Sequence, residues 1–260
     1  ALEYMVALAN TTDKDIWICI PHAADDTYIR EAAMFLRDQL NPALKIYIEY
    51  SNETWNSLFS QTTYVQDQGE ALALSSNRWE AGQRFAALRS IQMWDIFEQE
   101  FVDDSRLEKI LATQSAGSST TDMRVAMIND PDFNPNRVMP NALAIAPYFG
   151  FYYSQSYIDA FGYPTMDDIL DTVAPNEISA VRSDVQSQKQ VAVPYNISWG
   201  GGSQGLYENL TFNTSNSGTT IEGCPPYQQD PNDLGLLIEK YFAGTYDGGI
   251  SQIRQYIKPL

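Results

Sequence analysis

The sequence predicts an α/β fold of parallel strands and crossover helices, closed as a (β/α) barrel of the TIM type. Short apolar runs alternate with segments of helical periodicity, a pattern typical of parallel strands joined by helices. Polar side chains also follow successive predicted strands where each strand ends, and the carboxyl ends of barrel strands meet on one face. A doubly wound sheet would share the alternation, but no Gly-rich phosphate loop follows the first strand.

The first half of the chain predicts two strands and three helical segments. An apolar run ended by a proline predicts a strand at 15–22, and a capping Asp before an apolar stripe predicts a helix at 25–40. The run KIYIEY predicts a strand at 45–50. Large apolar residues at helical spacing predict helices over 61–101, with a break near 75–77. The opening ALEYMVALAN has the composition of a helix interior.

The second half predicts three more strands. Apolar runs predict strands at 106–117, 141–150 and 189–202, and helical periodicity predicts helices over 165–188 and 233–244. We therefore expect a barrel portion over 1–205. A loop and C-terminal helices over 206–260 complete or flank it.

Composition excludes several classes of partner. The 260 residues carry 16 basic and 33 acidic side chains, for a formal charge of −17, and the basic residues do not cluster. Nucleic acid and anionic membrane surfaces are disfavoured, whereas neutral ligands such as sugars are not. No apolar run approaches the roughly 20 residues that span a bilayer. One His and no Cys/His cluster predict neither a metal site nor a cofactor.

The surface chemistry favours an extracellular protein. Asn209 and Asn213 lie in Asn-x-Thr/Ser tripeptides within a polar stretch, which predicts glycosylation in a surface loop. High acidity with few lysines and cysteines also fits secretion. We expect Cys19, which lies in an apolar run, to be a buried free thiol.

The stretch SNETWN after the second strand carries the chemistry of a sugar site. Glycosidic cleavage needs a carboxyl group that protonates the leaving oxygen, and Glu53 stands where a barrel places its active site. Asn52 could hydrogen-bond a sugar hydroxyl, and Trp55 could stack on a pyranose. A solvated loop carboxylate beside a structural Trp explains the same residues without function.

The chain resembles the clan A glycoside hydrolases, which are (β/α)8 barrels with an Asn-Glu pair at the end of strand 4. The stretch IYIEYSNETWN looks like their strand 4, WICIPHAADDTYI like strand 3, ILATQSAG like strand 5 and ALAIAPYFG like strand 6. The resemblance implies Glu53 as general acid/base. It also implies that Asn52 is the partner of Glu53 and that His22, Gln114 and Tyr148 line the pocket. Trp55, by its stacking surface, and Trp199, by its place after a predicted strand, complete the expected carbohydrate site.

The family's second carboxylate has no evident counterpart. A Glu should end strand 7, but the aligned position is Gly200, and the nearest acid is Glu208. Glu49 lies four residues before Glu53, and continued strand geometry would put the two about 13 Å apart. Strands 1, 2 and 8 also lack counterparts, so protein partners or the remainder of a longer chain would cover the missing part of the barrel.

Two functions follow as expectations. The first is an extracellular glycosidase that acts on a β-linked polysaccharide through Glu53. The second is a pseudoenzyme, the same barrel without its nucleophile, which serves as a structural or carbohydrate-binding glycoprotein.

Overall fold

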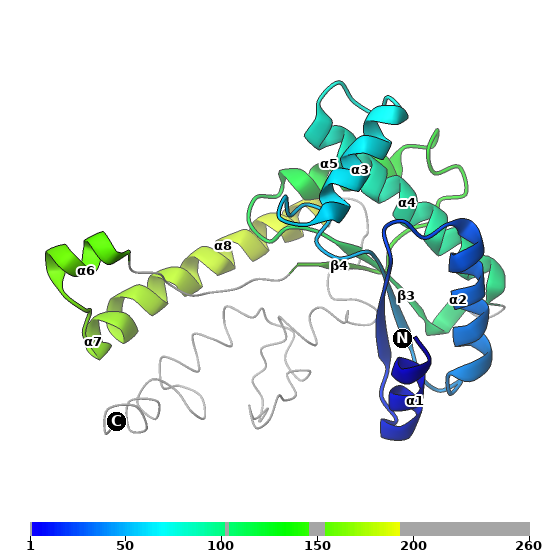
Figure 1. Cartoon of the computed structure of the whole chain (residues 1–260), viewed down its shortest axis with the longest axis horizontal. Coiled ribbons are helices and arrows are strands. Elements are labelled where there is room, and N and C mark those ends of the chain that lie inside the picture. The colour runs from blue at the N-terminus through cyan, green and yellow to red at the C-terminus, as the bar shows by residue number, and fades with distance from the viewer. Residues whose placement is uncertain (1, 102–103, 146–153, 193–260) are drawn as a thin grey trace. The chain divides into compact units, whose positions relative to one another are not determined.

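The computed structural model describes residues 2–101, 104–145 and 154–192, which fall into two compact units (Figure 1). The first unit holds the sheet and most of the residues up to 145. The second holds the helices of 154–190. The predicted helix at 233–244 lies outside the described residues, as does the whole of 206–260.

Four parallel strands form the sheet of the first unit, in the order β1-β2-β3-β4 along the chain. In the register, Cys19 lies opposite Glu49, and Glu49 lies opposite Ile110. The predicted α/β class with parallel strands is therefore confirmed. The strands are β1 (Ile16–Ile20), β2 (Ile46–Tyr50), β3 (Leu107–Ala112) and β4 (Ala142–Ala144).

One face of the sheet is covered by helices. Side chains alternate between faces along a strand, so Ile46 and Ile48 share a face, and both are fully buried. The Trp94 indole on α4 donates to the Ile48 carbonyl at 3.4 Å, which places α4 against that face. The helices of this unit are α1 (Leu2–Thr12), α2 (Asp26–Gln39), α3 (Ser60–Ala71), α4 (Arg78–Glu100), the 3₁₀ turn η1 (Asp104–Arg106) and α5 (Ser119–Asn129).

Side-chain caps fix where α2 and α4 begin. The Asp25 carboxylate accepts from the backbone N–H of Tyr28 at 2.8 Å, and the Asn77 amide oxygen accepts from that of Glu80 at 3.0 Å. The predicted break near 75–77 is confirmed, because Asn77 starts a new helix there.

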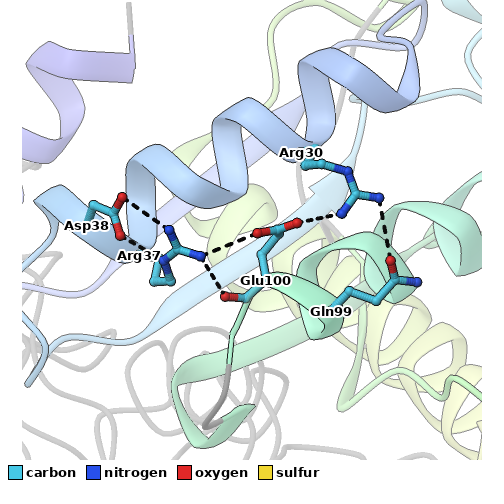
Figure 2. A network of polar contacts seen from close by, with 5 residues as sticks. All are labelled: Arg30, Arg37, Asp38, Gln99 and Glu100. Atoms are coloured by element: carbon cyan, nitrogen blue, oxygen red, sulfur yellow. Dashed lines mark hydrogen bonds and ion pairs between the residues drawn. The ribbon is translucent and has the colours of Figure 1, made fainter.

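A polar network joins α2 to the C-terminal end of α4 (Figure 2). Arg30 Nη1 lies 2.5 Å from Glu100 Oε1, and Arg37 Nη1 lies 3.3 Å from Glu100 Oε2. Arg37 also pairs with Asp38 at 2.7 Å. The arginines are partly exposed, so solvent screens these ion pairs and each adds little to stability. The network mainly orients two helices that already share a buried apolar contact.

The second unit consists of consecutive helical segments. The stretch predicted as a fifth strand begins inside a helix, because α8 runs without a break through residues 189–192; residues 193–202 lie outside the described part. Ile178, Val181 and Val185 form a buried stripe at helical spacing that defines α8. The segments are α6 (Gln155–Phe161), α7 (Met166–Asp168), the π-helical stretch η2 (Ile169–Val173) and α8 (Ala174–Ala192). In the ranges that the structure describes, no helix is both long and apolar enough to cross a bilayer.

Candidate active site

The loop that leaves β2 has an unusual backbone. The Ser51 N–H donates to the Ile20 carbonyl at 2.7 Å, so the chain is still anchored beside β1 as it turns. Ser51 and Glu53 have φ angles of 58° and 46°, in the left-handed region that side chains disfavour. Two such residues within three positions cost free energy, and strain of this kind clusters at functional sites.

Glu53 is held in place by a neighbour from the same loop. The Asn56 side-chain amide donates to Glu53 Oε2 at 2.8 Å, and the Asn56 backbone N–H donates to the Glu53 carbonyl at 2.9 Å. The Glu53 side chain is half-buried. Its carboxylate therefore has a fixed orientation while it remains in reach of solvent.

Asn52 lies on the outside of the same turn. Its side chain is exposed, and its carbonyl accepts from Gln61 Nε2 at 2.7 Å. That hydrogen bond ties the loop to the first turn of α3. The side chain of Asn52 is therefore in contact with solvent.

A second carboxyl group, Glu49, lies on β2 on the face opposite the helices. It accepts from Trp17 Nε1 at 2.9 Å and from the Cys19 thiol. Burial raises its pKa to about 7; the bonds from Trp17 and Cys19 and the charge of Arg124 oppose that rise, and the Glu53 charge adds to it. The influence of the Glu53 charge is the smallest of these, after burial, the two hydrogen bonds and Arg124.

The backbone bears on the sequence-based position of Glu49 relative to Glu53. Placing it about 13 Å from Glu53 assumed that the strand continued through both residues, but β2 ends at Tyr50. The left-handed residues Ser51 and Glu53 redirect the chain, so strand geometry does not apply to the pair.

Arg124, which the sequence did not single out, is the cation of the site. It lies on α5 and is buried, and burial lowers its pKa to about 10, against the opposing charge of Glu49. The guanidinium therefore stays charged at neutral pH. Its carbon lies 5.2 Å from the centre of the Trp55 ring, a cation–π contact that fixes this half-buried indole.

His22 belongs to an aromatic cluster beside α3. Its ring meets the edge of Tyr64 at 5.0 Å between centroids, and its carbonyl accepts from the Tyr50 hydroxyl at 2.8 Å. Tyr64 in turn contacts Phe85 on α4 at 6.2 Å. These contacts fit a residue that anchors the β1 exit loop. Gln114 follows β3 by two positions and is half-buried.

The remaining predicted site residues lie outside the described residues. Tyr148 and Trp199 fall there, as do the predicted glycosylation sites Asn209 and Asn213 and the strand 7 positions Gly200 and Glu208. The structure therefore keeps Asn52, Glu53 and Trp55 in one loop and brings Arg124 to that loop through Thr54 and Trp55.

The prediction of a buried Cys19 is wrong. Cys19 is exposed and lies on the sheet face opposite the helices, whereas its apolar neighbours Ile18 and Ile20 point into the core. Flanking side chains still desolvate the sulfur. That desolvation, together with the charge and hydrogen bond of Glu49, raises the pKa of the thiol to about 12. Burial alternates along β1, but the sequence shows only a continuous apolar run there and so did not reveal the alternation.

Among the residues that the structure describes, no group of three or more His, Cys, Asp or Glu side chains is arranged to hold a metal ion. Comparisons with protein-family models, with curated proteins and with solved structures gave no match to this chain. A functional proposal must therefore come from the chemistry of the loop and its neighbours.

Proposed function

We propose that this chain is part of a secreted, glycoside hydrolase-like (β/α) barrel that acts on a β-linked polysaccharide, with Glu53 as general acid/base. The observation that carries the proposal is the oriented, half-buried Glu53 carboxylate on a strained loop at the carboxyl edge of a parallel sheet. Active sites of parallel α/β folds are built at that edge.

The order of the strands supports a barrel over a doubly wound sheet. The four strands follow one another in chain order, whereas a doubly wound sheet reverses its order at a switch point. In the described part of the chain, the outer edges of β1 and β4 pair with no further strand. Other residues of the chain, or a protein partner, would supply the strands that close the barrel.

The side chains around Glu53 suit a neutral sugar. A carboxyl group protonates the glycosidic oxygen, and a rigid indole such as Trp55 offers a flat apolar surface to a pyranose. Glu49, with its pKa near 7, is mostly neutral in mildly acidic solution, so it adds little negative charge beside Glu53 there. The net charge of −17 agrees with a carbohydrate ligand and disfavours nucleic acid and anionic membranes.

A second candidate function is binding without turnover, as a structural or carbohydrate-binding glycoprotein. Glu49 favours it, because this carboxyl accepts hydrogen bonds from Trp17 and Cys19 and is only 8% exposed, so it is badly placed to attack a sugar carbon. A glycosidase needs a second carboxyl group, either as the nucleophile or as the base that activates a water molecule.

The experiment that separates these functions uses the whole chain and the variant Glu53→Gln. Release of reducing ends from β-glucan and β-mannan reports hydrolysis, and calorimetric titration with β-linked hexasaccharides reports binding. We expect parental hydrolysis to fall by roughly 100-fold or more in Glu53→Gln, with binding retained. Glu31→Gln, an exposed change on α2, should match the parent.

The other outcomes are equally informative. A parent that binds the sugars without hydrolysing them supports the second function. A parent that neither binds nor hydrolyses them, or hydrolysis that survives Glu53→Gln, shows that the proposal is wrong.

A further inference from the structure

We propose that Arg124 is a positioning residue that holds the Glu53 loop and the Trp55 ring at the carboxyl end of β3. Its importance for sugar binding rests on the proposed function, but its hold on the loop does not. The structure assigns it this role through contacts with three separate elements.

The guanidinium of Arg124 joins β3, the loop and α4. Nη1 donates to the Ala112 carbonyl at the end of β3 at 2.5 Å, and Nη2 donates to Thr54 Oγ1 in the loop at 2.6 Å. Nε and Nη2 both donate to Gln83 Oε1 on α4, at 3.1 and 2.7 Å. One side chain therefore fixes the residue next to Glu53 relative to the sheet and to a long helix.

The cluster is closed to water. Arg124 is 4% exposed, Thr54 is 1% exposed and Gln83 is fully buried. Water cannot replace a hydrogen bond that is lost in such a place, so removal of one partner leaves another polar group unsatisfied. The loop is thereby held more firmly than surface hydrogen bonds such as that of Asn52 could hold it.

The Gln83 side chain is oriented toward Arg124. Its amide oxygen accepts twice from Arg124, while its buried Nε2 has no hydrogen-bond partner within the part of the chain that the structure describes. An unsatisfied buried donor is costly. The hydrogen bonds from Arg124 therefore set the orientation of the Gln83 amide, although its Nε2 gains no hydrogen bond in that orientation.

Trp55 is held by the same cation. With the guanidinium 5.2 Å from its ring centre, the indole has one preferred orientation beside Glu53. A ligand that stacks on a fixed ring loses less freedom on binding than one that must first order it. Arg124 would therefore contribute to sugar affinity without touching the sugar.

Hydrogen–deuterium exchange of the whole chain tests the positioning role without any sugar. Thr54→Val removes the hydroxyl that Arg124 reaches, at nearly constant volume, and Thr54→Ser restores it. We expect the amides of residues 51–56 to exchange about tenfold faster in Thr54→Val, as for one lost buried hydrogen bond, and at the parental rate in Thr54→Ser. Amides of β1 should be unchanged in both.

Arg124→Met removes all four hydrogen bonds and should accelerate exchange of residues 51–56 further. Arg106→Met is its matched control, because Arg106 donates to the Leu44 and Asn41 carbonyls, which lie at the amino ends of the strands, before β2. It should leave residues 51–56 unchanged. Should Arg124→Met fail to fold, the Thr54 pair decides alone.

Parental exchange of residues 51–56 in Thr54→Val would overturn the proposal. Where the parent binds a β-linked hexasaccharide, Thr54→Val should weaken binding by about tenfold and Thr54→Ser should not. Unchanged affinity beside a loosened loop would overturn the contribution to binding. A parent that binds no sugar contradicts the proposed function and leaves the exchange result to decide the role of Arg124.

Discussion

The Trp17 indole N–H donates to the Glu49 carboxylate at 2.9 Å, joining side chains of the neighbouring strands β1 and β2. The bond lies on the sheet face opposite the helices and orients the carboxylate of a buried acid. Burial, two hydrogen bonds and two opposite charges all act on the pKa of Glu49, so its protonation responds to a change in any of them.

Glu49 should make stability depend on pH in a defined window. Its pKa is about 7 in the folded protein and ordinarily 4.5, so the folded chain holds a proton that the unfolded chain has lost between these values. The free energy of unfolding should therefore fall as pH rises through this window, by about 3 kcal/mol from this group. Urea unfolding at pH 4.5 to 8 measures it.

Glu49→Gln is the control for that window, because it cannot titrate and still accepts from Trp17. Its stability relative to the parent should rise by about 3 kcal/mol between pH 4.5 and 8. Parallel stability curves for the two proteins would show that Glu49 titrates near its ordinary pKa.

Trp17→Phe should move the titration of Glu49 to higher pH. The indole hydrogen bond stabilises the carboxylate form and lowers its pKa, so its loss raises the pKa by about 1. Carbon-13 NMR of the glutamate carboxyls measures the midpoint. Trp79→Phe, on α4, should leave the midpoint in place, and a midpoint that falls or stays in Trp17→Phe would contradict the role of the bond.

Gly69→Ala should disrupt the packing of α3 on α4. A Cβ at Gly69 would lie far inside the contact distance of the Ala81 carbonyl, which is backbone and cannot turn away. We expect a loss of about 3 kcal/mol in the free energy of unfolding, measured in urea. Thr63→Ala, exposed on the same helix, should cost less than about 0.5 kcal/mol. A Gly69→Ala variant as stable as that control would show that the helices can separate.

Glu53→Gly should separate stability from function. Glycine adopts a φ of 46° without strain, so the variant should be as stable as the parent or more stable by up to about 1 kcal/mol, while hydrolysis of β-linked substrates is lost. Arg137→Gly, at an exposed residue with a φ of 53°, relieves the same strain away from the site and should keep function. A clearly less stable Glu53→Gly would show that favourable contacts, rather than imposed strain, set this conformation.

The sequence predicted the elements with strong periodicity or clear caps. The strands at β1 and β2 and the helices α2, α3 and α4 lie within a few residues of their predicted bounds. It did not predict α5 at 119–129, because Thr and Ser dominate its first turn and its buried side chains include Thr120 and Arg124. A search for apolar periodicity does not detect a helix that buries polar residues.

The candidate site was predicted only where it is contiguous. One short stretch holds Asn52, Glu53 and Trp55, and the sequence alone predicts its chemistry. Arg124 reaches the loop from 70 residues away, and only the tertiary fold shows the contact. The end of β2 before Glu53 was not predicted, because the left-handed residue at this turn is Ser51 rather than a glycine.

The most direct test of the account is an experimental structure of the whole chain soaked with a β-linked hexasaccharide. The measured quantity is the distance from the Glu53 carboxyl to the nearest glycosidic oxygen. The account predicts about 3 Å, with a pyranose stacked on Trp55. A sugar bound at the amino edge of the strands, or crystals that take up none, would contradict it.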